Sequence, residues 1–219
     1  MSTTARSALA PARVVWVALE DARHVGHLAT EKWAEVGAED SLRGQLLIAV
    51  PPLLDPNFWR AVVLVVQHND EGALGLVLNR PAEATVADSV PALEALVDGE
   101  QQLFVGGPVA PSGVIVLARF EDPGQAALIA FEDVGLLAAG QEREAADADL
   151  RQSRAFVGHA GWGPGQLDAE LARGDWILEP ATVQDAFTER PAELWSEVLT
   201  RKGGQYALLA RMPADPSVN

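Results

Sequence analysis

Three short apolar runs near the start of the main part of the chain predict a β-sheet. Gln45–Val50, Ala61–Gln67 and Ala73–Asn79 are apolar almost throughout, and Pro51-Pro52 ends the first run. The second run is rich in β-branched residues, which is typical of a strand that is buried on both faces. Turn residues fill Asn69–Gly72, so the second and third runs are expected to form a hairpin.

The remaining pattern alternates further strands with short helices. Expected strands are Gln102–Val105, Gly113–Arg119, Gln152–Gly158, Asp175–Glu179 and Gln205–Arg211. Expected helices are Val86–Val97 (broken at Pro91), Pro164–Arg173, Thr182–Phe187 and Ala192–Lys202. Strands joined by tight turns, with helices mostly in the second half, predict the α/β class: an α/β sandwich with a mixed, largely antiparallel sheet flanked by helices. No glycine-rich fingerprint follows a first strand, which argues against a nucleotide-binding doubly wound fold.

The N-terminal part of the chain differs from the rest. Residues 1–40 are rich in alanine and lack strand patterning, so we expect a flexible N-terminal extension followed by one domain at residues 41–219. A start codon assigned too far upstream would give the same pattern, which leaves open whether residues 1–40 are part of the native product. A partner-binding tail is the other alternative for this segment.

Composition and charge exclude several kinds of function. The chain has 16 basic and 31 acidic residues, a net charge of −15, and no cysteine. Nucleic-acid binding relies on Lys and Arg to neutralise phosphates, so direct nucleic-acid binding is disfavoured. Disulfides and thiolate catalysis are excluded. The apolar run Val14–Leu19 is too short for a signal peptide or a membrane span, so we expect a cytoplasmic protein with no membrane partner.

A glycine-rich stretch, Gly158–Gln166, is the first candidate for function. Its four glycines allow close approach of the backbone to another surface, and Trp162 and Gln166 could supply an aromatic anchor and an amide for a shallow recognition cleft. The alternative, which the residues favour somewhat more, is a structural role: a tight turn whose tryptophan covers the core. Both interpretations remain open from the sequence.

Polar residues at strand and helix ends are the second candidate. Asp55, Arg60, His68, Asn79 and Arg80 lie where α/β proteins commonly build sites, and His68 could act as a general base oriented by Asp55. Asp55 is also explained as an N-cap, and a pair with Arg80 would tie the hairpin to the preceding turn. No serine or threonine of these segments is a suitable nucleophile, so no catalytic residue is assigned. We expect no metal site and no cofactor.

Three segments resemble a known family. Gly44–Pro81, Val105-Gly-Gly-Pro-Val109 and Phe156-Val-Gly-His-Ala-Gly-Trp-Gly-Pro-Gly-Gln-Leu167 are similar to the YqgE/AlgH family of bacterial proteins. The resemblance implies no established enzymatic activity, and the family's usual label is a regulator of transcription. The family's strand after the double glycine ends in a Leu-His pair, whereas this chain has Leu117-Ala118-Arg119, which argues against a catalytic role for that histidine.

Together these observations favour a non-enzymatic binding or regulatory module that acts through a shallow cleft lined by glycine and aromatic residues. Its partner would be a protein of unknown identity, and any effect on transcription would be indirect. The alternative is a small-molecule-binding protein or an enzyme that uses His68, Asn79 and Arg80. The candidate cleft residues are Asp55, Phe58, Arg60, His68, Asn79, Arg80, Gly106, Gly107, Pro108, Gly161, Trp162, Gly165, Gln166 and Leu167.

Overall fold

The computed structural model describes residues 17–18, 41–53, 55–94, 96–137 and 150–213. Of the predicted N-terminal extension, only Val17–Ala18 (β1) is described; β1 pairs antiparallel with β7 through Val17↔Val114, and the rest of residues 1–40 lies outside the described residues. The strands that follow are β2 Gln45–Ala49, β3 Val62–Asn69, β4 Gly72–Val77, β5 Pro81–Thr85, β6 Gln102–Val105, β7 Val109–Phe120, β8 Leu128–Phe131, β9 Val134–Leu136, β10 Leu150–Trp162 and β11 Trp176–Pro180. The helices are α1 Val86–Ser89, α3 Gln166–Arg173, α4 Val183–Ala186, α5 Pro191–Lys202 and α6 Gln205–Leu209, with 3-10 turns η1 Pro91–Leu93 and η2 Pro123–Gln125.

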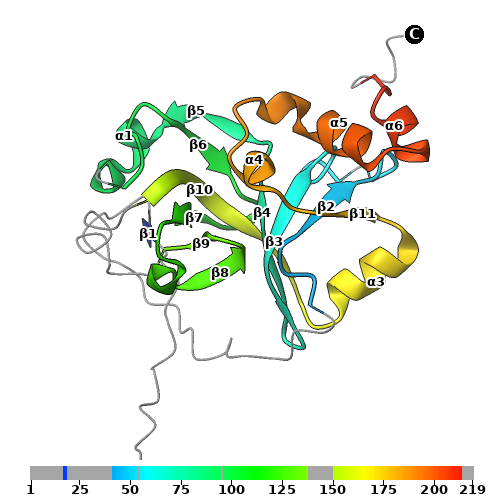
Figure 1. The fold of residues 1–219 in the computed structure, drawn as a ribbon, viewed down its shortest axis with the longest axis horizontal. Coiled ribbons are helices and arrows are strands. Elements are labelled where there is room, and N and C mark those ends of the chain that lie inside the picture. Colours follow the sequence, from blue (N-terminus) through cyan, green and yellow to red (C-terminus); the bar gives the residue numbers. More distant parts are fainter. Residues whose placement is uncertain (1–16, 19–40, 54, 95, 138–149, 214–219) are drawn as a thin grey trace, which may run out of the picture.

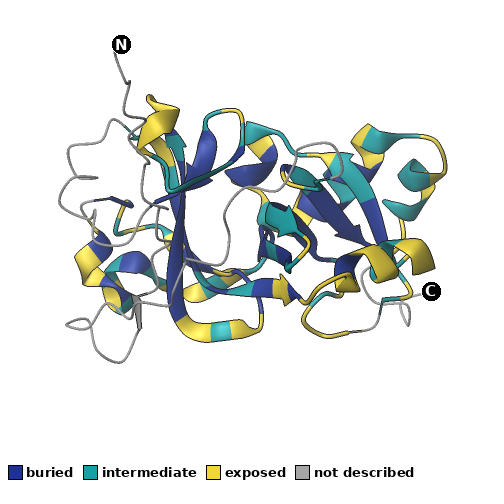
Figure 2. Cartoon of the chain, turned by 90° about the horizontal axis from the view of Figure 1, so that it is seen from below, coloured by how far each residue is buried: buried dark blue, intermediate teal, exposed yellow. Residues whose placement is uncertain are grey.

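The strands form one mixed, largely antiparallel sheet in the order β11-β2-β3-β4-β10-β7-β9-β8, with β5 and β6 attached beside β10 (Figure 1). This agrees with the predicted α/β class and with a mixed, mostly antiparallel sheet. Among the described residues, the helices are fewer and shorter than the predicted flanking helices implied, since four of the five α-helices have eight residues or fewer. Buried residues concentrate on the strands, and exposed residues gather on helices and turns (Figure 2).

The apolar core lies on both faces of the β2–β4 strands. Leu46, Ile48 and Leu64 face one side, where Trp195 of α5 packs on them. Alternate residues of the same strands face the other side, where they pack with Leu167 of α3. A third cluster joins α1 and η1 to β7 and β10. The all-apolar runs of β2 and β3 are therefore explained by burial on both faces.

Two glycine motifs are explained by a chain crossing. Phe156 and Val157 of β10 pair with β6 on one edge and with β7 on the other, so the connection Gly106–Pro108 between β6 and β7 must cross β10. It crosses at Gly158. A Cβ atom on Gly107 would lie 2.2 Å from the carbonyl carbon of His159, and one on Gly158 would lie 2.4 Å from the Gly107 oxygen. Both positions also have positive φ, so larger residues do not fit.

Most predicted strands and helices are present, but the closing strand expected at Gln205–Arg211 is wrong. This segment contains α6 instead, after Gly203 and Gly204, which have φ values of +77° and +55° and end α5. Short apolar runs do not distinguish strand from helix, and Ala and Leu favour the helix. Asp55–Phe58, which was predicted as a helix start or a turn, is a turn: the Asp55 Oδ1 atom accepts a hydrogen bond from the Asn57 N–H at 2.8 Å.

Candidate binding surface

The tryptophan of the glycine-rich stretch is buried. Trp162 is 6% exposed and lies within a group of rings whose other members are Phe58 and Trp176, with ring centroids 5.6 to 6.2 Å apart. Phe58 comes from the turn before β3, Trp162 from the end of β10 and Trp176 from the start of β11. The three rings pack on one another and on the core, and this contact fixes the end of β10 against the turn.

A single carboxylate satisfies the polar atoms of this group. Glu170 Oε2 accepts hydrogen bonds from the indole Nε1 atoms of Trp162 and Trp176, both at 2.8 Å. Its Oε1 atom accepts from the Gln166 amide at 3.0 Å, and the Gln166 Oε1 atom accepts from the Gly163 N–H at 3.1 Å. We call Phe58, Trp162, Trp176 and Glu170 the Trp162 cluster. Its geometry supports the structural interpretation of the glycine-rich stretch.

The other predicted residues of this stretch support the turn and the helix. Leu167 is buried in the core, and Gly165 precedes α3 with φ of +67°, where no side chain caps the helix. Gly161 is exposed on β10. Glu170 was absent from the predicted site residues, although its i, i+4 spacing from Gln166 on a helix indicates that their side chains can meet.

His68 lies far from Asn79 and Arg80. The His68 Nδ1 atom accepts a hydrogen bond from the Leu42 N–H at 3.2 Å, and its Nε2 atom is 3.8 Å from Asp168 Oδ1. Asn79 is buried at the other end of β3, where its Oδ1 accepts from the Val62 N–H at 3.0 Å. Because six strand residues span roughly 20 Å, His68 does not meet Asn79 or Arg80. The three residues of the alternative enzyme site therefore do not converge.

Arg80 and Asn79 hold the turn before β3. Arg80 Nη2 donates to the Trp59 carbonyl and Nη1 donates to the Asn79 carbonyl at 3.3 Å, while Asn79 Nδ2 donates to the Arg60 carbonyl at 2.9 Å. Asp55, which is exposed, is not ion-paired with Arg80 within the described part of the chain, so the predicted pair is not formed. Burial lowers the pKa of Arg80 from its ordinary value.

Arg60 is the most unusual residue of this turn. Its φ is +51°, a region that non-glycine residues seldom adopt. The guanidinium lies 4.4 Å from the Trp195 ring centroid and 5.4 Å from that of Trp59. Its Nη2 atom donates to the carbonyl oxygens of Met212 and Pro213, the latter at 2.6 Å. Burial lowers the pKa of Arg60 from its ordinary value.

Two residues that contact this arginine expose apolar side chains. Trp59 is 37% exposed and its ring contacts Arg60; Met212 is 45% exposed and contacts Arg60 through its main-chain carbonyl. Arg80 touches the same tryptophan through its backbone carbonyl. We call Trp59, Arg60, Arg80 and Met212 the Trp59 surface. It joins exposed apolar area to two arginines on a chain whose net charge is −15.

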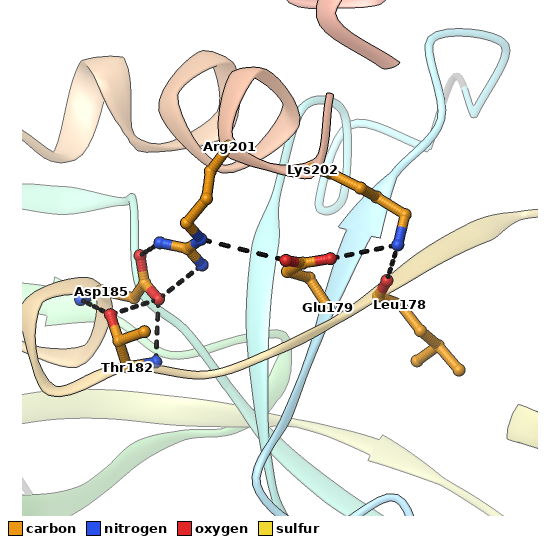
Figure 3. A network of polar contacts seen from close by, with 6 residues as sticks. All are labelled: Leu178, Glu179, Thr182, Asp185, Arg201 and Lys202. Atoms are coloured by element: carbon orange, nitrogen blue, oxygen red, sulfur yellow. Dashed lines mark hydrogen bonds and ion pairs between the residues drawn. The ribbon is translucent and has the colours of Figure 1, made fainter. Parts of the chain in front are cut away.

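A separate polar network near α4 and α5 is structural (Figure 3). Arg201 donates from Nη1 and Nη2 to the two oxygens of buried Asp185, each at 2.8 Å, and Asp185 Oδ2 also accepts from Thr182. Lys202 Nζ lies 3.1 Å from Glu179 Oε2 and donates to the Leu178 carbonyl at 2.8 Å. These contacts attach α4 and α5 to β11.

Two further basic groups lie on β10: Arg154, which is buried, and His159, which is half-buried and belongs to the glycine-rich stretch Gly158–Gln166. Burial lowers the pKa of Arg154 to about 10; its guanidinium lies 4.3 Å from the Phe104 ring centroid and donates to the Thr188 carbonyl at 2.7 Å. Burial lowers the pKa of His159 to about 4, against an opposing effect from a hydrogen bond with the Val109 backbone. Sequence reasoning found no signal for Arg154, and it placed His159 in the glycine-rich stretch without indicating its burial, which follows from the position of β10 within the sheet.

No group of three or more His, Asp or Glu side chains among the described residues is arranged to hold a metal ion. No helix in the same part of the chain has the length and apolar character needed to cross a membrane.

The mixed, largely antiparallel sheet that contains β10, together with the paired glycine motifs where the chain crosses β10, identifies this protein as a member of the α/β class. Residues 46–207 match the family described as AlgH-like, and the chain therefore belongs to the AlgH-like family, as the sequence resemblance predicted. A UPF0301 protein of Thermobifida fusca is 40% identical over 190 residues, which cover 82% of this chain and 96% of the relative. One from Streptomyces avermitilis is 39% identical over 187 residues, with the same coverage.

Two solved structures are similar to the fold. The solution structure of the AlgH protein from Pseudomonas aeruginosa aligns with a TM-score of 0.61 and 29% identity over 82% of this chain and 98% of that one. The crystal structure of a Corynebacterium diphtheriae protein aligns with a TM-score of 0.69 over 83% and 95% of the two chains; at 24% identity this match supports the fold alone.

Proposed function

We propose that this protein is a protein-binding module without catalytic chemistry of its own, and that it recognises its partner through the Trp59 surface. The observation that carries this proposal is an exposed tryptophan whose ring lies beside the Arg60 guanidinium and whose main-chain carbonyl accepts a hydrogen bond from Arg80. Trp and Arg are among the residue types most enriched where a few side chains dominate the energetics of protein interfaces. Any influence on transcription would act through that protein partner, because the charge of −15 opposes contact with DNA.

Four of the predicted cleft residues form or support the Trp59 surface. Phe58 and Asn79 hold the turn from the inside, and Arg60 and Arg80 are part of the surface itself. In the Trp162 cluster, Glu170 already accepts hydrogen bonds from the Trp162 indole N–H and from the Gln166 amide. That arrangement favours recognition at Trp59 over recognition at the glycine-rich stretch.

Site-specific photo-crosslinking in cells tests the proposal. A benzophenone amino acid is placed at Trp59, and the matched control is placed at Asp70, an exposed residue at the opposite end of β3. We expect a crosslinked protein partner from position 59 that is lost when Arg80→Glu is added. Identical products from positions 59 and 70, or no product at position 59 in a folded chain, would reject the proposed surface.

A further inference from the structure

The two arginines of the Trp59 surface differ from most other basic residues in having no carboxylate partner. Six basic residues elsewhere lie within 3.2 Å of a carboxylate oxygen: Arg119, Arg151, Arg173, Arg190, Arg201 and Lys202. Among the described residues, Arg60 and Arg80 form no ion pair, and both donate to main-chain carbonyls instead. In a chain with 31 acidic residues, two guanidiniums around Trp59 therefore meet no described counter-charge.

Both guanidiniums are also partly removed from water, since burial lowers the pKa of Arg60 and of Arg80. Carbonyl oxygens accept some of their N–H groups but carry no full negative charge, so the solvation lost on burial is only partly recovered. The Nε and Nη1 atoms of Arg60 and the Nε atom of Arg80 have no acceptor within the described part of the chain. A carboxylate from another molecule would supply both an acceptor and the missing charge.

Exposed apolar area lies beside these charges. The Trp59 ring contacts the Arg60 guanidinium, and Met212 is exposed where its main-chain carbonyl accepts from the same arginine. Arg211, which precedes Met212 in the chain, is exposed and is not ion-paired with any described residue. Interfaces match charge with opposite charge and apolar area with apolar area. The complement of this surface is therefore a segment that carries both carboxylates and apolar side chains.

We infer that the Trp59 surface binds an acidic segment of the partner protein, with carboxylates that contact Arg60 and Arg80 and an apolar side chain that packs on Trp59 and Met212. This inference rests on the proposed function and adds the chemical class of the partner. A nucleic acid offers the same negative charge, but its affinity depends on neutralising many phosphates, and this surface provides few arginines. Acidic residues elsewhere on the chain oppose the partner only weakly, because exposed charges more than about 8 Å apart are largely screened at physiological ionic strength.

Arg60 is positioned before a partner binds. Asn79 Nδ2 donates to the Arg60 carbonyl at 2.9 Å, and the guanidinium lies 4.4 Å from the Trp195 ring centroid. Trp195 is itself fixed by a hydrogen bond from its Nε1 to the Ala49 carbonyl at 2.9 Å. An arginine that is oriented in advance loses less conformational entropy when a carboxylate binds, which favours affinity.

Selection of short random peptides displayed on phage tests the inference. The full chain and a double variant, Arg60→Gln with Arg80→Gln, serve as parallel baits. We expect the peptides enriched on the full chain to combine Asp or Glu with large apolar residues, and we expect the double variant to enrich none of them. Enriched peptides that are neutral or basic, or no enriched peptide at all, would overturn the inference.

Fluorescence anisotropy then measures the contribution of the peptide's charge. A labelled acidic peptide from the selection and its amide version, with Gln for Glu and Asn for Asp, are each titrated with the full chain. We expect the amide version to bind about tenfold or more weakly, because hydrogen bonds to charged groups are stronger by about that factor. This comparison leaves the chain unchanged, so it decides the question even if the double variant does not fold. Equal affinities for the two peptides would show that the inference is wrong.

Single variants locate the binding. Arg60→Gln and Arg80→Gln should each weaken binding of the acidic peptide about tenfold. The matched control, Arg43→Gln, changes an exposed arginine near the start of β2 and should leave the affinity unchanged. Equal losses in all three variants would place the peptide elsewhere and overturn the inference. A labelled single-stranded DNA oligonucleotide that binds as tightly as the acidic peptide would assign the surface to nucleic acid, which also overturns it.

The results separate this inference from the proposed function. If position 59 crosslinks a protein partner but the acidic and amide peptides bind equally, the inference fails and the proposed function stands. If position 59 captures no partner in a folded chain, the proposed function fails, and the inference about that partner's chemistry fails with it.

Discussion

Phe58 and Trp59 are neighbours in the chain but belong to regions with opposite properties. Phe58 packs inside the Trp162 cluster, where both indole N–H groups donate to the carboxylate of Glu170. Trp59 lies on the surface beside Arg60, whose partners are ring faces and main-chain carbonyls. Every donor in the first region has a strong, fixed acceptor. The second region exposes apolar area beside an arginine, and it is the surface that we propose as the binding site.

Replacing one tryptophan of each region by alanine gives the largest expected difference in the free energy of unfolding. Trp162→Ala should lower the free energy of unfolding by roughly 3–5 kcal/mol, because a large buried ring leaves a cavity. Trp59→Ala should lower it by about 1 kcal/mol or less, the loss of a surface contact with the Arg60 guanidinium. Urea unfolding followed by far-UV circular dichroism measures both. Equal losses would show that the two tryptophans do not differ in structural role.

Glu170→Gln tests the hydrogen bonds of the Trp162 cluster with little change in shape. The amide loses the negative charge and brings an N–H donor toward groups that also donate, so we expect a loss of about 1–2 kcal/mol of unfolding free energy. Glu83→Gln, at an exposed position of β5, is the matched control and should change stability by about 0.5 kcal/mol or less. A stability loss no larger than that of the control would mean that the indole donors do not depend on the carboxylate.

Acidification should weaken the buried part of β10 through His159. The pKa of this histidine is lowered to about 4 in the folded chain from an ordinary value of 6.5. The unfolded chain therefore binds the proton more readily between these values, and the stability contribution present above pH 6.5 is lost as pH falls toward 4. We expect about 1 kcal/mol, after allowing for solvent screening of a partly exposed ring.

Because carboxylates titrate over the same range, the measurement is a difference between two chains. Urea unfolding of the wild type and of His159→Gln is compared at pH 7.5 and pH 5. The wild type should lose more stability on acidification than the variant. A variant whose stability falls as steeply as that of the wild type would assign the pH dependence to other groups.

The apolar pattern along the chain was sufficient to predict most of the fold. All-apolar runs identified β2, β3 and β4 because their burial on both faces is a local property of sequence. The segment at Gln205–Arg211 was predicted wrongly because a short run of Ala and Leu fits strand and helix equally. β5, which begins at Pro81, was not predicted, since its residues are mostly exposed and show no alternation.

The site was harder to predict because its contacts join distant positions. The sequence singled out Arg60 and Trp162 but could not assign their partners. Arg60 meets a carbonyl 152 positions away, and Trp162 meets Trp176 only because β10 and β11 flank α3. Gly107 and Gly158 were noticed in separate motifs, yet each is required by the other. The predicted pair of Asp55 and Arg80 failed because a closer backbone donor, the Asn57 N–H, engages the carboxylate.

The crossing of Gly106–Pro108 over β10 has a consequence for how the chain folds. β10 lies between two strands that a short connection already joins, and it pairs with β4, β6 and β7, all of which precede it in the chain. Such non-local pairings are slow to form, because the entropy of closing a long loop is lost before any contact is gained. During synthesis, the edges of β6 and β7 remain without this partner until β10 has emerged. We therefore expect the insertion of β10 to be the late, rate-limiting event of folding, and the interval before it to be the period when the nascent chain is most prone to aggregate.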